Sequence, residues 1–468
     1  MAQAKKTAAK TSTSAATAPR KASARKAPAK KSTATKKASS AKVAKKAPAP
    51  KPSAKGSAAK PSRTYDLTVF GATGFTGRLV AKYLAGHAPA DMRIALAGRD
   101  RGRVEQIRDE IGGRAHDFGI VTANVKDDAS LAAMAADTTA LITTVGPYAS
   151  YGLPVVAACA EAGTHYCDLT GEVLFMRDSI DRYDDIARAS GARIVHSCGF
   201  DSIPSDLGVL ALQLAATADD PKAELGDTRL VVTGAKGGVS GGTIASGLGE
   251  LERAGSDATA ARVLADPYSL SPDRGAEPTP GDAADPKGPV HDDVVGAWLA
   301  PFLMGPINSR VVRRSNALGD YSYGRGFRYQ EYVATGDGPL GRLSAFGLSA
   351  GMATAAAALG LDPVRSLAAK ILPDPGEGPG EEARAQGRFS IVLHTRTKQG
   401  VPYRAKVAAQ GDPGYAATAM MLATTGMTLA TGTDLPDVAG VLTPATGIGE
   451  PLITALKRAG MTLEAARV

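Results

Sequence analysis

Three evenly spaced glycines carry the clearest chemical signal in this sequence. Gly71, Gly74 and Gly77 follow the β-prone run 67–70 and precede apolar residues at helical spacing. A glycine turn between a strand and a helix lets backbone approach a pyrophosphate, and the helix N-terminus supplies free N–H groups and partial positive charge. The alternative is a tight turn without a ligand. The residues predicted here to bind a dinucleotide are Gly71, Thr73, Gly74, Phe75, Thr76 and Gly77.

The second predicted strand, 93–97, leads to an arginine where NAD-dependent enzymes usually place an acidic residue. Arg99 stands 28 residues after Gly71. A carboxylate there would bind the ribose 2′-hydroxyl, whereas a cation suits a 2′-phosphate, with Arg103 one turn onward as a helper. The sequence therefore predicts NADPH (NADP) in preference to NADH. In the alternative, Arg99 is solvated and Asp100 binds the ribose.

A later strand, 140–145, runs into a turn that should lie beside the same cofactor. The carboxyl ends of parallel strands line the cofactor crevice in a doubly wound sheet. Tyr148 and Tyr151 follow this turn, and either phenol could donate a proton to a reduced substrate; the alternative is that both only pack. The residues predicted to contact the ribose and nicotinamide are Thr144, Gly146 and Pro147.

Two further polar segments stand near the predicted crevice. Segment 165–172 combines a histidine with Asp168 and Glu172, but its spacing is not that of a zinc site, so no metal is expected. We expect these carboxylates to fix loops or backbone at the edge of the crevice. Segment 198–206 is a dense polar turn that leads into the second domain, where a hinge or the substrate floor would lie.

The positive charge of the chain is confined to its N-terminus. Residues 1–63 contain 18 Lys and Arg and no Asp or Glu, so the net charge of +9 leaves 9 − 18 = −9 for the remainder. Residues 1–62 are Ala, Lys, Ser, Thr and Pro with almost no large apolar side chain, which predicts a disordered basic tail. Such a tail is either an inert polycation or a nonspecific contact for nucleic acid or anionic lipid.

Strand and helix patterns alternate about six times after Tyr65, which predicts an α/β, doubly wound Rossmann domain at 63–200. Strand-like runs at 229–233, 321–334 and 388–397 then predict a second α+β domain for substrate or oligomerisation at 201–410, with a long surface loop near 266–289. Helical spacing predicts that 411–468 is a C-terminal helical segment packing back on the body.

Three features bear on location. Cys159, Cys167 and Cys198 lack paired spacing and are expected to be buried thiols of a cytoplasmic protein. No secretory signal is expected, because no apolar run follows the positive N-terminus. The uncharged stretch 343–361 is rich in Ala, Gly and Ser, so a buried or interfacial helix is favoured over a membrane span.

The sequence resembles the saccharopine dehydrogenase-like oxidoreductases and, within them, the actinobacterial trans-acting enoyl reductases. The resemblance implies a Rossmann domain, a mixed second domain and NADPH-dependent reduction of an enoyl thioester held on a polyketide synthase that lacks its own enoyl reductase. Hydride would add to Cβ and an acid would protonate Cα. It spans nearly all of the chain past Tyr65 and rests on Tyr65-Asp66-Leu67 and on segments 71–77, 97–99, 146–148, 166–172, 199–206 and 440–445.

Two other functions are weighed against this reductase. A saccharopine dehydrogenase-type oxidoreductase of a small amino or oxo acid would need cations such as Arg310, Arg313 or Arg325 beside the substrate carboxylates. A noncatalytic NADP-binding or nucleic-acid-associated protein would suit the tail but not the acidic body. The expected partner is a lipid or polyketide thioester, presented by an acyl carrier domain. A homodimer, and a cytoplasmic location that includes the membrane periphery, are also expected.

Removal of residues 1–62 is predicted to leave the reductase active and to abolish any affinity for DNA or anionic vesicles. The tail holds the excess positive charge, whereas the remaining chain contains every candidate catalytic residue. Binding through the tail should weaken steeply with salt, because it releases counterions. Titrations of full-length and truncated protein at several salt concentrations check this. Salt-sensitive DNA binding that survives truncation would place a basic patch elsewhere.

Overall fold

The computed structural model describes residues 63–237, 241–278, 285–359 and 380–468. The predicted tail, and parts of the loop expected near 266–289 and of the stretch 343–361, lie outside these residues. Within the described loop residues, the short helix η2 (Arg274–Ala276) forms, and Tyr268, Leu270 and Ser271 are buried. The beginning of this loop is therefore packed into the protein.

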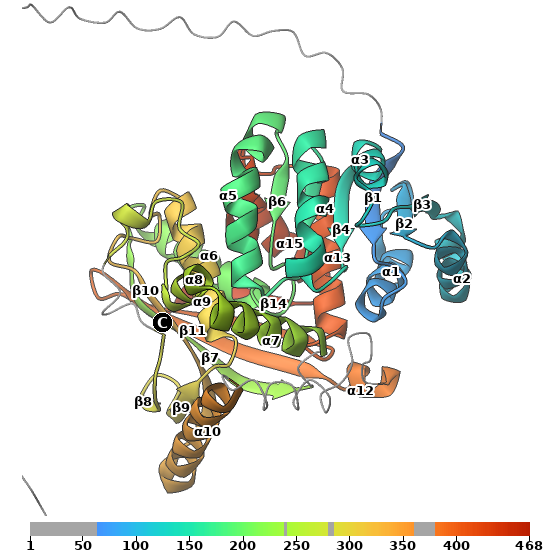
Figure 1. The fold of residues 1–468 in the computed structure, drawn as a ribbon. Helices are drawn as coiled ribbons and strands as arrows, with labels where there is room; N and C mark the ends of the chain where they lie inside the picture. Colours follow the sequence, from blue (N-terminus) through green and yellow to red (C-terminus); the bar gives the residue numbers. More distant parts are fainter. Residues whose placement is uncertain (1–62, 238–240, 279–284, 360–379) are drawn as a thin grey trace, which may run out of the picture. The chain divides into compact units, whose positions relative to one another are not determined.

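The first sheet is fully parallel and has seven strands in the order β13-β6-β5-β4-β1-β2-β3 (Figure 1). Its centre is the pair β1 and β4, where the strand order reverses. This arrangement confirms the predicted doubly wound fold. The strands are β1 (Tyr65–Phe70), β2 (Ile94–Gly98), β3 (Gly119–Thr122), β4 (Thr138–Thr143), β5 (His165–Cys167), β6 (Arg193–Val195) and β13 (Gly440–Leu442).

Both faces of this sheet are covered, because side chains alternate between the faces along each strand. Leu67 and Val69 of β1 share one apolar core with helices α1 and α13, whereas Phe70 belongs to a second core with α3, α4 and α5. The packing of α13 is close, since a Cβ on Gly426 would touch Ile142. The helices around the sheet are α1 (Phe75–His87), α2 (Arg101–Ile111), η1 (Gly113–Asp117), α3 (Asp128–Ala136), α4 (Tyr148–Ala162), α5 (Val173–Ser190) and α13 (Ala416–Thr431).

A second, mixed sheet follows in the order β14-β12-β11-β7-β10-β9-β8. Strands β7 and β10 pair in parallel and the other neighbours are antiparallel, which confirms the predicted α+β part. Helix α6 (Ile203–Asp219) packs on β12 and β14, and α9 (Gly305–Leu318) packs on β10. The strands are β7 (Leu225–Lys236), β8 (Val290–Asp292), β9 (Ala297–Pro301), β10 (Arg328–Gly336), β11 (Arg388–Thr397), β12 (Pro402–Gln410) and β14 (Thr462–Arg467).

The last segment was expected to be helical, and it contributes two strands as well. After α13, β13 joins the parallel sheet beside β6, and after α14 (Pro444–Gly447) and α15 (Glu450–Arg458), β14 joins the mixed sheet beside β12. Both strands lie at sheet edges. β13 has only three residues, in which period-two alternation cannot show, and the six residues of β14 (Thr-Leu-Glu-Ala-Ala-Arg) consist mostly of strong helix formers. The predicted domain boundaries stay predictions.

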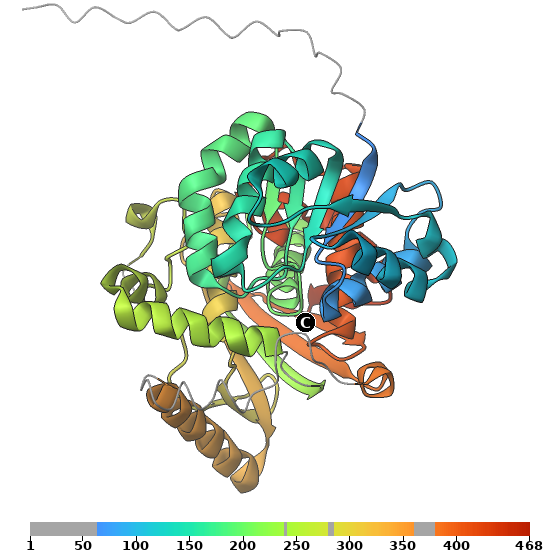
Figure 2. The same ribbon diagram turned by 45° about the vertical axis from the view of Figure 1, so that its right-hand side comes forward.

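Helix α10 (Gly338–Leu359) forms most of the uncharged stretch, for which a buried or interfacial helix was favoured over a membrane span. The helix contacts β9 and β10 (Figures 1 and 2), with Gly341 and Ala345 buried, but the Leu343 side chain is 70% exposed and Phe346 is 48% exposed. No helix within the described residues is long and apolar enough to cross a membrane. The remaining helices are α7 (Gly241–Ser256), α8 (Ala258–Ala265) and α12 (Glu381–Ala385).

Candidate active site

The glycine turn joins β1 to α1 and is shaped by two close backbone approaches. Gly71 has φ +93, and a Cβ there would lie 2.8 Å from the hydroxyl of Thr144. A Cβ on Gly77 would overlap the carbonyl oxygen of Gly71. The Thr144 hydroxyl also donates to the Gly71 carbonyl at 3.2 Å, which ties the turn to the end of β4. Gly71 and Gly77 are therefore required by the fold itself.

Gly74 is different from these two glycines. Its φ of −78 is ordinary, and a Cβ there would meet only the Gly71 carbonyl oxygen, at 3.4 Å. The fold would thus accept a side chain at this position. Because Gly74 borders both cavities described below, the absence of a side chain keeps open a space that fits a pyrophosphate.

The N-terminus of α1 is electrostatically prepared for an anion. No side chain among the described residues caps it, and its first turn contains no acidic residue. The N-terminus of α4, by contrast, is already neutralised, because the Glu172 carboxylate accepts from the backbone N–H groups of Tyr148 (2.9 Å) and Ala149 (2.6 Å). The free N–H groups available to a phosphate are those of α1.

Two adjoining cavities surround this turn, and Gly74, Thr144 and Gly146 border both. All the residues predicted from sequence to bind cofactor or to catalyse line one cavity or the other; their roles stay predictions. The first cavity, of about 280 Å³, includes Phe75, Thr76, Gly77, Pro147 and Tyr148. The second, of about 480 Å³, includes Gly71, Thr73, Arg99 and Tyr151.

The second cavity has the charge expected for a 2′-phosphate. The exposed side chain of Arg99 borders it, and so does that of Lys126, a cation after β3 that sequence reasoning missed. Asp100, the alternative ribose ligand, accepts from the N–H of Arg103 at 3.0 Å and caps α2. Arg103 itself does not border either cavity. The geometry therefore favours Arg99 over Asp100 as the residue that would contact the 2′ substituent of the ribose.

The two candidate tyrosines stand in different places. Tyr148 is buried at the start of α4, and its hydroxyl donates to the carbonyl of Thr143 at 3.1 Å. Burial raises the pKa of this phenol well above its ordinary value, and the nearby Asp168 carboxylate adds to the rise. Tyr151 borders the second cavity, on the same side as Arg99. The structure therefore does not bring the two phenols to one cavity.

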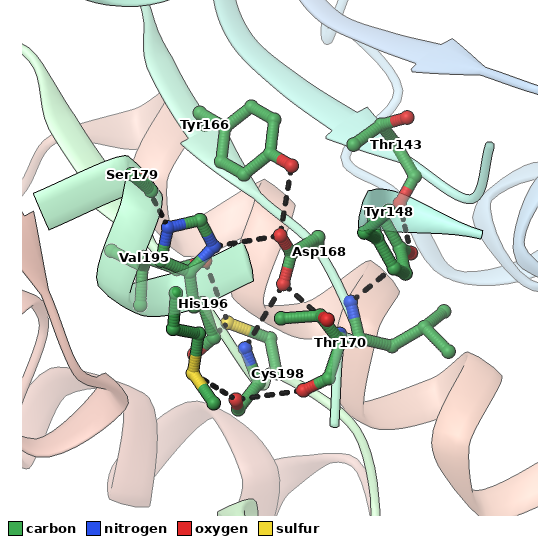
Figure 3. A network of polar contacts seen from close by, with 12 residues as sticks. Thr143, Tyr148, Tyr166, Asp168, Thr170, Ser179, Val195, His196 and Cys198 are labelled. Atoms are coloured by element: carbon green, nitrogen blue, oxygen red, sulfur yellow. Dashed lines mark hydrogen bonds and ion pairs between the residues drawn. The ribbon is translucent and has the colours of Figure 1, made fainter. Parts of the chain in front are cut away.

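Asp168 holds together the carboxyl ends of β5 and β6 (Figure 3). One carboxylate oxygen accepts from the hydroxyl of Tyr166 (2.8 Å) and bonds Nδ1 of His196 (2.7 Å). The other accepts from the N–H groups of Thr170 (3.1 Å) and Ser197 (3.0 Å). With Glu172 on the start of α4, this agrees with the expectation that these carboxylates fix backbone. No cluster of three or more potential metal ligands occurs among the described residues.

Two carboxyl groups in the first cavity were not identified as site residues from sequence. Burial raises the pKa of Asp201, in the turn before α6, to about 6. It also raises the pKa of Glu250, on α7, to about 7. Asp201 belongs to a polar turn in which the residue spacing does not single out any one side chain. Glu250 lies on a helix that contains no recognisable sequence motif. Only the packing of α6 and α7 near the glycine turn reveals them.

The arginines proposed for an amino-acid substrate lie elsewhere. Arg310 and Arg313 are buried on α9 and form ion pairs with Asp285. Arg325 stacks on the ring of Tyr321, 4.1 Å from its centroid. Among the described residues that border the first cavity, none is Lys or Arg.

Comparison with known proteins places the chain in a family. Residues 67–195 match the saccharopine dehydrogenase NADP binding domain. A trans-acting enoyl reductase of Mycobacterium tuberculosis is 41% identical over 418 residues, 87% of this chain and 99% of the relative. The chain belongs to the family of trans-acting enoyl reductases. Another M. tuberculosis relative, provisionally given the same name, is 49% identical over 87% of this chain and 98% of its own.

Membership in this family confirms the resemblance read from the sequence. The chain is an oxidoreductase that uses NADPH. Among solved structures, an apo saccharopine dehydrogenase (L-Glu forming) from Saccharomyces cerevisiae is 13% identical, with a TM-score of 0.47 over 86% of this chain and 99% of the other.

Arg99→Asp is predicted to weaken NADPH binding by roughly 10- to 100-fold, the value of one lost charge-assisted contact, while leaving NADH binding nearly unchanged. Lys126→Ala should act in the same direction with a smaller effect. Arg101→Asp is the matched control, because Arg101 pairs with Glu105 on the surface of α2 and borders neither cavity. Calorimetric titration of both cofactors measures these changes. Equal wild-type affinities for NADPH and NADH would contradict the assignment.

Gly74→Val is predicted to abolish NADPH binding in a folded protein, because the fold tolerates a side chain there and the pyrophosphate does not. Gly86→Val is the matched control: the same substitution on the same helix, at an exposed position where a Cβ meets no atom within 4 Å. Thermal melts and NADPH titrations of both variants are compared. An undiminished NADPH affinity in a folded Gly74→Val variant would show that the turn is not the phosphate site.

Proposed function

We propose that this protein reduces the α,β double bond of an enoyl thioester, a polyketide or lipid intermediate, with NADPH. The observation that carries the proposal is the lining of the first cavity, which begins at the glycine turn. Its side chains are apolar, acidic or neutral hydroxyl groups (Thr76, Thr144, Tyr148, Ser246 and Tyr415), and none of the described ones is a cation. An uncharged enoyl thioester has no carboxylate near its reacting carbons, so it requires no cation there.

The same lining argues against an amino or oxo acid as substrate. Such a molecule would bring carboxylates into a cavity that already contains Asp201 and Glu250. None of the described residues around this cavity is a cation that could pair with those carboxylates, and an unpaired charge in a confined site is costly. The arginines that would compensate are committed to Asp285 and to Tyr321. The noncatalytic alternative has no support in a family named for enoyl reduction.

Different residues around the two cavities are assigned to different parts of the cofactor. We assign the pyrophosphate to the turn and the α1 N-terminus, with Gly71, Thr73, Gly74, Phe75, Thr76 and Gly77. Arg99 and Lys126 then neutralise the 2′-phosphate, and Thr144, Gly146 and Pro147 lie along the nicotinamide ribose. When bound, NADPH supplies the hydride that reduces Cβ. The first cavity shields the reacting atoms from water, and an acid in it must protonate Cα.

Tyr148 and Tyr151 remain candidates for that acid. The hydroxyl of Tyr148 is engaged by Thr143, and Tyr151 borders the second cavity, so neither contact favours proton donation. Substituting each tyrosine with phenylalanine removes the proton and preserves the ring. A loss of turnover of about 100-fold, with unchanged NADPH affinity, identifies a general acid.

The same proposal extends to the carrier of the substrate, the cellular location and the oligomeric state. We propose that an acyl carrier domain presents the thioester, that the protein works in the cytoplasm, including at the membrane periphery, and that it forms a homodimer. The basic tail then adds nonspecific contact with nucleic acid or anionic lipid.

The proposed function predicts that NADPH is oxidised with trans-2-enoyl thioesters. It predicts no oxidation with 2-oxo acids, whether or not an amine is present. Both sets are offered to the full-length protein, as N-acetylcysteamine thioesters and then as thioesters on an acyl carrier domain. The product is identified by mass spectrometry as two hydrogens heavier. Turnover with oxo or imino acids alone would establish the competing amino-acid dehydrogenase instead.

A further inference from the structure

The turn between β6 and α6 is held rigidly against two other helices. The N–H of Phe200 donates to the hydroxyl of Thr418 on α13 at 3.0 Å. The hydroxyl of Ser202 donates to the side-chain oxygen of Asn308 on α9 at 3.0 Å. Asp201 lies between these two anchored residues and borders the first cavity. Its carboxyl group is therefore placed by neighbours on both sides.

The half-buried Asp201 carboxyl differs from the buried acids Asp168 and Asp206 in its contacts with described residues. Asp168 has four hydrogen-bonding groups, and Asp206 accepts from the Ser315 hydroxyl and the Ala445 N–H. Within the described part of the chain, the structure records no hydrogen bond or ion pair for the Asp201 side chain. Asp201 is half-buried, and an acid that faces a cavity without a protein partner is available to a bound molecule.

Asp201 shares its cavity with residues that we assign to the cofactor. Asp201, on the turn that leads to α6, borders the first cavity together with Gly74 of the glycine turn and Pro147. Burial raises the pKa of the Asp201 carboxyl to about 6, and it is the only cause of that rise, since no neighbouring charge contributes. A substrate that displaces water from the cavity would raise this pKa further.

We propose that Asp201 is the catalytic acid that protonates Cα of the enoyl thioester; the inference rests on the proposed function. Hydride from NADPH forms the new C–H bond at Cβ, and the π electrons move to give an enolate of the thioester. The neutral Asp201 carboxyl then transfers its proton to Cα, which restores the carbonyl. The products are the saturated thioester, NADP⁺ and an Asp201 carboxylate that regains a proton from solvent.

Three other titratable groups face the same cavity, and each is engaged elsewhere. Glu250 of α7 accepts from the N–H of Leu174 at 2.7 Å. The Tyr148 hydroxyl of α4 donates to a backbone carbonyl, and the Tyr415 hydroxyl, before α13, accepts from the N–H of Gly241. Burial raises the pKa of both phenols, which makes them weaker acids. Asp201 alone in this set combines an acid of suitable strength with a carboxyl that has no recorded partner.

The test compares Asp201→Asn with the wild type on trans-2-octenoyl-N-acetylcysteamine thioester. We expect kcat to fall by about 100-fold or more, the usual contribution of a general acid. NADPH affinity, measured by fluorescence titration without substrate, and the melting temperature should stay at wild-type values. Asp227→Asn, at an exposed position on β7, is the matched control and should keep full activity. Glu250→Gln tests the other cavity carboxyl.

A second readout separates proton donation from a structural role. Reduction of a 2-methyl-2-enoyl thioester in deuterated water places deuterium at Cα, and the wild type should give one configuration there. In Asp201→Asn, slow protonation by water should give both configurations. Retained stereochemistry together with kcat within about threefold of wild type overturns the proposal. A loss confined to Glu250→Gln overturns it as well, because the acid would then lie on α7.

The pH dependence of the wild type keeps the test valid even if Asp201→Asn does not fold. The acid form of Asp201 exists below its pKa, so kcat should be highest at low pH and fall as the pH rises through about 6 or somewhat above. A flat profile across this range overturns the proposal. A wild-type protein that reduces no enoyl thioester overturns both the proposed function and this inference, whereas the other negative outcomes overturn the inference alone.

Discussion

The fully bonded carboxylate of Asp168 is the interaction on which the active-site side of the molecule depends. A buried charge is stable only when its lone pairs are satisfied, and Asp168 meets this condition with two side chains and two backbone N–H groups from β5, β6 and the segments after them. These contacts fix where the chain goes after each strand. One of those chain segments carries Glu172 to the start of α4, and the other carries Asp201 to the first cavity.

The two helix N-termini at the centre of the sheet illustrate how charge is distributed over the site. Glu172 neutralises the N-terminus of α4 from within the protein, so that end is no longer available to an external anion. No side chain in the described part of the chain caps the N-terminus of α1, and no side chain of residue 74 covers it. The cations Arg99 and Lys126 border the second cavity, and the acids Asp201 and Glu250 border the first. The two cavities therefore differ in their electrostatic environments.

Close backbone packing accounts for the rest of the geometry. Gly71, Gly77 and Gly426 bring the turn, α1 and α13 within van der Waals contact of β4 and its neighbours. This packing places Tyr415, just before α13, against the ring of Phe75 at the edge of the first cavity. Residues separated by more than 300 positions in the chain therefore form one wall. The mixed sheet supports α6 and α9, which in turn hold the turn that contains Asp201.

The sequence by itself determined the cofactor half of this protein. The glycine spacing, Arg99 and the turn after 140–145 are local patterns, because a dinucleotide is bound by one strand, one turn and one helix that are contiguous in the chain. Strands β5 and β13 have three residues each and at most one β-branched residue, whereas the equally short β6 contains Ile194 and Val195 and carries a stronger β signal. Lys126, Asp201 and Glu250 were not predicted as site residues, because only the cavity that each borders gives them a role. Only the tertiary structure decided which residues border each cavity, because burial, hydrogen-bond partners and cavity linings arise when segments distant in the chain pack together.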